Sequence, residues 1–205
     1  MLTSPTTDVL QIKTSHERLL LPNQFSYFDT LKKWEHHYRD RVNSILSEAK
    51  SFSLPITPEP FESYFSGFEF TYIPFDNSAQ PKLDGCWDRN EGQIRIFYSS
   101  NAPEVRQRFT ITHELIHVYQ AFDPEFLAEM EAIKSPQQRE QLMERIANKT
   151  AAYYLAPLPL LAAEAKTTPH ILSLAAMFGV STQAMEICLK DYGIVIDEKA
   201  YKPPW

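Results

Sequence analysis

The sequence predicts an α+β protein, with a helical core, a small three-stranded antiparallel sheet and a pair of short helices near the C-terminus. Three observations support this class. Segments such as 26–50 and 137–155 repeat apolar residues at the three-four spacing of helices. Short segments between residues 68 and 98 alternate as strands do. A Gly-Val-Ser turn at 179–181 separates two short helical patterns.

Helix signals bound the elements that precede the sheet. Ser26 can cap a helix that runs to about Lys50, because a serine hydroxyl accepts a hydrogen bond from the first turn. Pro58 can begin a short helix that Gly67 ends. Residues 1–25 are polar and weakly patterned, which predicts a flexible N-terminal arm.

The expected strands are 68–73, 83–88 and 93–98, and the last two are joined by a turn at 89–92. The final strand ends just before 101–103, whose Asn-Ala-Pro sequence can start a helix. Three short strands in one stretch of chain therefore predict a small sheet next to that helix.

The segments after residue 122 alternate between charged and helical patterns. Residues 123–134 are expected to form a charged, flexible connection. Ser135 and Pro136 then open a helix that runs to about Leu155 and stops at Pro157. This helix is the second long one of the predicted core.

Two short helices, 171–178 and 182–190, are predicted around the turn at 179–181, which is the order of a helix-turn-helix. The second helix is not strongly basic, so it makes a poor recognition surface for DNA. We expect a packing or substrate-docking role for this pair rather than DNA binding.

A His-Glu-x-x-His motif lies at the centre of the chain, in the predicted helix 109–119. Residues four apart share one helix face, so His113 and His117 can direct two imidazole nitrogens at one metal ion. Glu114 lies about 100° around the helix, where it can hold a water molecule without binding the metal. The alternative is that two histidines lie four residues apart by accident. Apolar residues surround the motif on nearly all sides, so the helix should be buried, and buried histidines without partners are costly. A zinc ion would be such a partner.

Glu144 is the expected third zinc ligand, on the helix that begins at Ser135. It shares a helix face with small residues, which allow close approach to a neighbouring helix. Two histidines and one glutamate form a catalytic zinc set with an open fourth position. Glu140 is the second choice, and a surface pair of Glu144 with Arg145 or Arg139 is the alternative.

Composition limits the partners and the compartment. The 205 residues, with 43% hydrophobic and 22% charged, are typical of a globular protein. The net charge of -6 gives no overall attraction to nucleic acid or anionic membrane. Cys86 and Cys188 form no Cys-x-x-Cys, which fits a reducing compartment. With no apolar run of membrane-spanning length and no signal-peptide pattern, we expect a soluble cytoplasmic protein without membrane contact.

The order of these motifs resembles the ImmA/IrrE metallopeptidases. The stretch Arg106-Gln-Arg-Phe-Thr-Ile-Thr-His-Glu-Leu-Ile-His117 is similar to that family's Arg-x-Arg-Phe-Thr-x-Ala-His-Glu-Leu-Gly-His signature. Glu144-Arg-Ile-Ala-Asn-Lys-Thr-Ala-Ala-Tyr-Tyr-Leu-Ala-Pro157 is similar to its second motif, and 174–181 to its C-terminal helical module. Ile116 replaces the usual glycine, but no ligand position is lost.

The resemblance implies a gluzincin-like zinc metalloprotease with a zincin-like helical core. His113, His117 and Glu144 would hold Zn²⁺, and Glu114 would be the catalytic base. The substrate would be a cytoplasmic protein, a helix-turn-helix repressor of stress-response, DNA-damage or mobile-element genes. We expect a flexible arm at 1–25, a metallopeptidase domain at 26–157 and a C-terminal helical module with a tail at 158–205.

Several roles stay open on the sequence alone. Tyr119, Tyr153 and Tyr154 are candidates for stabilising an oxyanion, although each is more typical of a core aromatic residue. Cys86 could cap the zinc or be a buried structural thiol.

Arg106 and Arg108 could pair with acidic residues or support the site. The rival function is a non-enzymatic regulator that binds DNA or a partner through the C-terminal helices and carries a structural metal, which would need four protein ligands.

Overall fold

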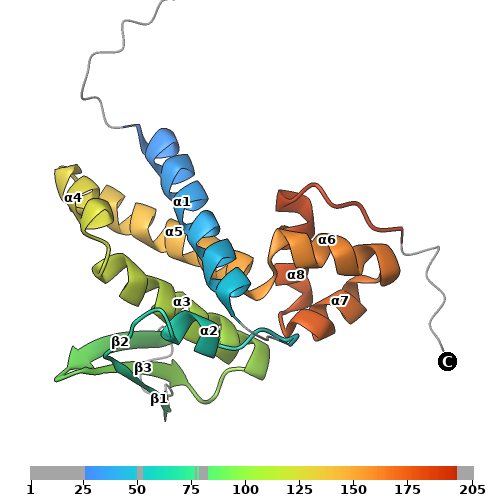
Figure 1. Ribbon diagram of the computed structural model, residues 1–205, viewed down its shortest axis with the longest axis horizontal. Coiled ribbons are helices and arrows are strands. Elements are labelled where there is room, and N and C mark those ends of the chain that lie inside the picture. Colours follow the sequence, from blue (N-terminus) through green and yellow to red (C-terminus); the bar gives the residue numbers. More distant parts are fainter. Residues whose placement is uncertain (1–25, 50–52, 77, 79–82, 198–205) are drawn as a thin grey trace, which may run out of the picture.

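The computed structural model describes residues 26–49, 53–76, 78 and 83–197, and within them eight helices and one three-stranded sheet (Figure 1). The α+β class is thereby confirmed. The elements are α1 Tyr27–Glu48, α2 Glu59–Glu62, β1 Glu69–Phe75, β2 Gly85–Asn90, β3 Gln93–Ser99, α3 Glu104–Ala121, α4 Pro124–Ala132, α5 Pro136–Leu155, α6 Leu158–Thr167, α7 Ile171–Phe178 and α8 Thr182–Asp191. The expected arm at 1–25 lies outside the described residues.

Side-chain caps begin the helices that frame the core. The Ser26 hydroxyl accepts a hydrogen bond from the backbone N–H of Asp29, and the Ser135 hydroxyl from that of Gln138. Each cap satisfies one of the N–H groups that a helix start leaves without a partner. The predicted starts of α1 and α5 are therefore confirmed.

The charged segment after residue 122 is a helix, so the expectation of a flexible connection at 123–134 is wrong. Asp123 caps α4 by accepting from the N–H of Phe126, and Pro124 occupies the first turn. Phe126 and Met130, four residues apart, are almost completely buried. Two apolar anchors on one face were enough to fold the segment onto α1, where the Phe126 ring meets Trp34 edge-on.

The sheet is mixed, which corrects the expected antiparallel arrangement. Its order is β1-β3-β2, with β1 parallel to β3 and β2 antiparallel to β3. The tight turn at Glu91 and Gly92 makes β2 and β3 a hairpin, as predicted. β3 is the central strand, with β2 hydrogen-bonded to one edge and β1 to the other. Consequently β2 keeps an open edge.

Helix α3 lies between the sheet and α5, and α1 packs against α5 (Figure 1). Ile94 and Ile96 of β3 are fully buried, as is Leu115 of α3. Tyr38, on α1, is 1% exposed and meets the ring of Tyr119 edge-on. Because α3 is covered on both sides, its polar residues must find partners within the protein.

The C-terminal helices form a group beside the end of α5 (Figure 1). Helix α6, Leu158–Thr167, was not anticipated, and α7 and α8 agree with the predicted pair. The axes of α7 and α8 are bent by 101° across the turn that Gly179 begins. A helix-turn-helix role and a domain boundary at 157 stay predictions. Among the described residues, no single helix is both long enough and apolar enough to cross a membrane.

Candidate metal centre

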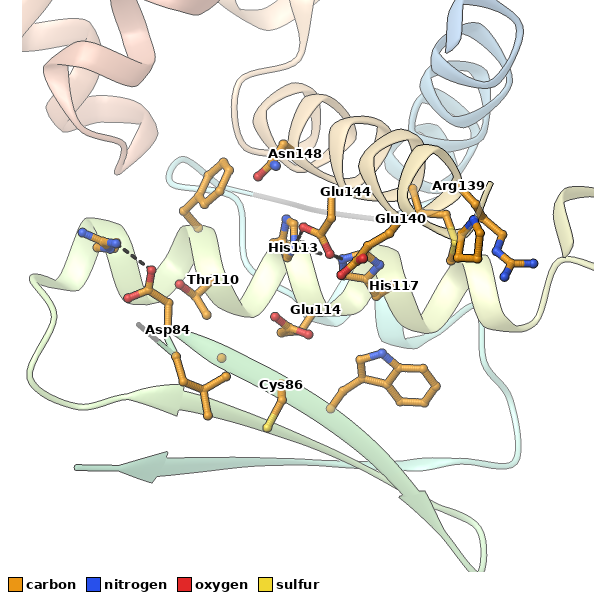
Figure 2. Close-up of a pocket in the computed structure, with 17 residues that line it drawn as sticks. Asp84, Cys86, Thr110, His113, Glu114, His117, Arg139, Glu140, Glu144 and Asn148 are labelled. Atoms are coloured by element: carbon orange, nitrogen blue, oxygen red, sulfur yellow. Dashed lines mark hydrogen bonds and ion pairs between the residues drawn. The ribbon is translucent and has the colours of Figure 1, made fainter. Parts of the chain in front are cut away.

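Helix α3 directs two imidazoles toward α5 from one face. His113 and His117 are four residues apart, and their ring centroids lie 4.5 Å from each other. Their Nε2 atoms are 2.9 Å apart, and each side chain is 14% exposed. The two rings therefore converge at the inner wall of a groove (Figure 2).

Helix α5 supplies a carboxylate to the same point. Glu144 Oε2 lies 3.4 Å from His113 Nε2, and Glu144 Oε1 lies 3.1 Å from His117 Nε2. Donor atoms of a tetrahedral ion with bonds of 2.0–2.1 Å are about 3.3 Å apart, so this triangle has the right size for zinc. Among the described residues, these three side chains are the group that could hold a metal ion. The sequence left open a surface ion pair of Glu144 with Arg145 or Arg139. In the structure the carboxylate contacts the two histidines instead.

Burial keeps the first of these histidines, His113, uncharged. It lowers the pKa of His113 to about 4, and the neighbouring His117 contributes, while Glu144 opposes the shift. A neutral imidazole presents a free electron pair, which is the form that binds a metal ion. His113 is therefore neutral at physiological pH without help from a metal.

Glu114 faces β2 rather than α5 (Figure 2). Its residue is only 8% exposed, and burial raises the pKa of Glu114 to about 7, with a further contribution from the charge of Glu144. A nearby dication would oppose this shift, because it favours the ionised carboxylate. A carboxyl group with a pKa near neutrality can both accept and release a proton.

An open groove of about 1040 Å³ runs past these four residues, between β2 and α5. Leu83, Asp84, Arg106 and Phe109 line it toward the start of α3. The opposite part is lined by Trp87, Pro136, Arg139, Glu140 and Met143. The groove leaves the donor cluster, which consists of His113, His117 and Glu144, accessible from solvent on one side.

The IrrE N-terminal-like domain, a peptidase family, matches residues 67–190, from the start of β1 into α8. This match covers more than half of the chain, and it includes Glu114 and the three converging donors His113, His117 and Glu144. The chain belongs to the IrrE N-terminal-like peptidase family. The resemblance drawn from the sequence motifs is thus confirmed.

One curated protein and one solved structure show what this IrrE-like chain is similar to. It is 34% identical to the radiation response metalloprotease IrrE of Deinococcus radiodurans over 79 residues, 38% of this chain and 24% of that protein. A Mycobacterium tuberculosis transcriptional regulator has a similar structure, with a TM-score of 0.57 and 14% identity, over 81% of this chain and 52% of that one. The second likeness concerns the fold alone. This chain spans about a quarter and about half of their respective lengths.

A metallopeptidase relative implies a metal ion, and the residues present fit one. Two imidazoles and a carboxylate converge with donor atoms within 4.8 Å of one another. His113 Nδ1 is buried without a hydrogen-bond partner among the described residues, although a buried polar atom normally has one. The fit therefore rests on the donor set itself, two imidazoles and a carboxylate directed at one point.

The other candidates of the IrrE-like chain lie elsewhere. Glu140 lines the groove but is outside the converging donors.

The three tyrosines considered for stabilising an oxyanion have partners in the core. The Tyr153 hydroxyl donates to Asn43 Oδ1 at 2.9 Å, and the Tyr154 hydroxyl to the Thr57 carbonyl at 2.8 Å. Tyr119 packs among aromatic rings of α1 and α2. The three tyrosines are core residues, so the oxyanion candidates among them are not brought to the groove.

Cys86 is exposed on β2, so the interpretation as a buried structural thiol is wrong. Its side chain points away from α3 (Figure 2). Partial burial raises the pKa of the Cys86 thiol, and the charges of Glu114 and Asp88 add to this effect. A thiol held in its protonated form is a poor metal ligand, and Cys86 is not part of the converging group.

The two arginines before the motif have separate structural roles. Arg106 pairs with Asp84 of the groove at 2.6 Å. Arg108 Nη2 donates to the Ile56 carbonyl at 2.7 Å, and its Nε donates to the Gly179 carbonyl at 3.3 Å. Arg108 thus connects the motif helix to the C-terminal helices instead of facing the groove.

Two residues near the centre escaped the sequence reasoning. Gln120 Oε1 accepts a hydrogen bond from the outer nitrogen of His117, Nδ1, at 2.8 Å. The spacing of three residues on α3 is the signal that could have suggested this contact. Gly85 allows β2 to approach Glu114, since a Cβ at this glycine would lie 3.2 Å from Glu114 Oε1. No sequence pattern indicates that approach, because strand and helix are brought together only by the fold.

We expect Gly85→Ala to destabilise the IrrE-like chain by about 1–3 kcal/mol, the usual range for overpacking. The added Cβ would lie 2.4 Å from Thr110 Cγ2 and 2.9 Å from the Phe97 carbonyl oxygen, so β2 must move. Urea unfolding measures the loss. The double variant Gly85→Ala/Thr110→Ser, which removes the methyl group, should recover part of it. Equal stability of Gly85→Ala and wild type would contradict this close approach.

Proposed function

We propose that this protein is a zinc-dependent endopeptidase that cleaves a cytoplasmic helix-turn-helix repressor. The observation that carries the proposal is the convergence of His113, His117 and Glu144 next to Glu114 in an open groove. Two histidines and a glutamate with one open side form a typical catalytic zinc set. Membership of a peptidase family supports the same reaction class.

Zinc bound by these ligands would supply Lewis-acid polarisation of the scissile carbonyl and a more acidic water. The protein's own part is proton transfer by Glu114. A carboxylate oxygen of Glu114 accepts a proton from the attacking water and later delivers it to the nitrogen of the leaving amine. Its place next to His113 on α3, in the wall of the same groove, suits both steps.

The open edge of β2 gives an extended peptide a place beside Glu114. Ser99 N–H donates to the Asp84 carbonyl, which makes Asp84 and Ser99 a hydrogen-bonded pair of the hairpin. Because such pairs alternate along antiparallel strands, the main-chain groups of Gly85 and Trp87 point away from β3, toward the open edge. A substrate strand can add to this edge by main-chain hydrogen bonds, as edge strands commonly allow.

The repressor as substrate comes from the family resemblance. The cytoplasmic location rests on the two cysteines, which are both free, and on the resemblance. A structural metal in a non-enzymatic regulator is the weaker alternative. Glu144 is 51% exposed in its side chain, so the donor cluster opens onto the groove, whereas structural zinc sites are closed by a fourth protein ligand.

The test combines metal analysis with a cleavage assay. The purified chain should retain about one zinc per molecule and cut a helix-turn-helix repressor encoded beside its gene, and a zinc chelator should stop the cleavage. Mass spectrometry of the fragments identifies the cleaved bond. A zinc-loaded protein that binds duplex DNA in a salt-dependent manner, but cleaves no repressor, would support the regulator instead.

A further inference from the structure

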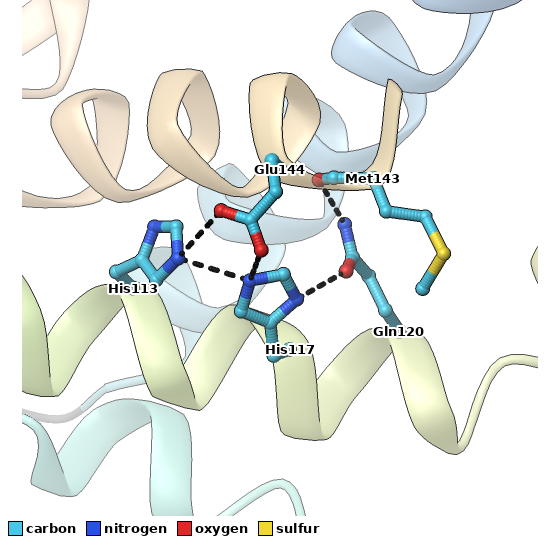
Figure 3. A network of polar contacts seen from close by, with 5 residues as sticks. All are labelled: His113, His117, Gln120, Met143 and Glu144. Carbon is cyan, nitrogen blue, oxygen red and sulfur yellow. Dashed lines mark hydrogen bonds and ion pairs between the residues drawn. The ribbon is translucent and has the colours of Figure 1, made fainter. Parts of the chain in front are cut away.

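Gln120 is a completely buried amide at the end of the motif helix. Its residue is 0% exposed, and it follows His117 by three positions on α3. Its side chain reaches two groups, His117 Nδ1 through Oε1 at 2.8 Å and the Met143 carbonyl through Nε2 at 3.1 Å (Figure 3). An amide without access to water needs a hydrogen-bond partner for its oxygen and for its NH₂ group, because an unpaired buried polar group is costly. The two contacts of Gln120 supply both partners.

The direction of these bonds follows from the chemistry of the partners. The Met143 carbonyl can only accept a hydrogen bond, so the amide NH₂ of Gln120 must face it. The amide oxygen then faces His117 and can only accept, which requires a proton on His117 Nδ1. In the neutral ring, Nε2 consequently carries the free electron pair that points at the donor cluster.

We infer that Gln120 is a positioning residue that holds His117 in its metal-binding tautomer and ties that ring to the α5 backbone beside Glu144. This inference rests on the metal site of the proposed function. Met143 directly precedes Glu144, so one amide connects a ligand on α3 to the chain position next to the ligand on α5. Partners of this kind orient metal-binding histidines and increase their basicity.

The same reasoning predicts that the two histidines differ in the metal-free protein. In the neutral His117 ring Nε2 has no proton, so the proton in its 2.9 Å contact with His113 Nε2 belongs to His113. His113 Nδ1 is then the deprotonated nitrogen of that ring. His117 Nε2 can therefore bind a cation directly, whereas the proton on His113 must first move from Nε2 to Nδ1.

The test compares wild type with Gln120→Met, which keeps the length of the side chain and removes both hydrogen bonds. The matched control is Gln107→Met, on the same helix, whose amide donates to the Ala102 carbonyl at 2.7 Å, away from the ligands. Ring ¹⁵N shifts of the metal-free proteins report each tautomer, and competition with a chelator gives the zinc affinity.

In wild type we expect a protonated Nδ1 in His117 and a protonated Nε2 in His113. Gln120→Met should allow the Nε2–H form of His117 and weaken zinc binding by about 10- to 100-fold. Gln107→Met should change neither property.

Gln120→Glu covers the case in which Gln120→Met does not fold. A glutamate oxygen still accepts from Nδ1–H, so the His117 tautomer should be retained. A His117 Nδ1 without a proton in wild type, or equal zinc affinity in wild type and Gln120→Met, would overturn the inference. Failure of wild type itself to bind zinc would instead overturn the proposed function, because the tautomers are measured without metal.

Discussion

Glu114→Gln is expected to reduce peptide cleavage by about 100- to 10,000-fold, the contribution of a positioned general base. The amide has the same shape and can still hold a water molecule, but it cannot take its proton. Glu114 faces β2 and is not among the converging donors, so the variant should keep its zinc. Cleavage rates under single-turnover conditions and zinc content, measured on the same preparation, check both parts.

The control for this variant is Glu131→Gln, an equal change of charge at an exposed position on α4. It should cleave at the wild-type rate. Burial disfavours the charged carboxylate of Glu114, and a neutral amide avoids that cost, so Glu114→Gln should be at least as stable as wild type in the metal-free state. Cleavage by Glu114→Gln at the rate of the control would show that another group accepts the proton.

Glu144→Ala is expected to weaken zinc binding by at least about 100-fold. Loss of a residue that only supports a metal ligand weakens binding by up to about 100-fold, and this change removes a ligand itself. Its carboxylate bridges both imidazoles, at 3.4 Å and 3.1 Å. With two histidines left, the metal would have too few protein ligands for a stable site. Chelator competition gives the affinity, and circular dichroism confirms that α5 is intact.

The matched variant is Glu140→Ala, one turn earlier on the same helix. Glu140 also lines the groove, but its carboxylate is not within the donor cluster, so zinc should stay bound. The pair separates loss of a ligand from loss of negative charge along the groove. Weak zinc binding in Glu140→Ala together with normal binding in Glu144→Ala would exchange their roles.

Local signals in the sequence were sufficient for most elements. Ser26 and Ser135 cap helices where predicted, and the hairpin of β2 and β3 turns at Gly92, as expected. The same rules underestimated α4, because its charged residues concealed the two buried anchors Phe126 and Met130. They also gave no means of choosing the partner of β1, since parallel pairing with β3 depends on contacts far apart in sequence.

The candidate site divides in the same way. The spacing of His113, Glu114 and His117 follows from the period of a helix, so the sequence by itself determined that two imidazoles share one face and the carboxyl group another. The small residues on the face of the second long helix indicated Glu144 as the third ligand, and the family motifs agreed. Only the tertiary structure decided the distance between α3 and α5, the approach of Gly85 to Glu114, and the link from Gln120 to the backbone beside Glu144. The reason is that helix geometry is set by neighbouring residues, whereas these contacts depend on how separate elements pack against one another.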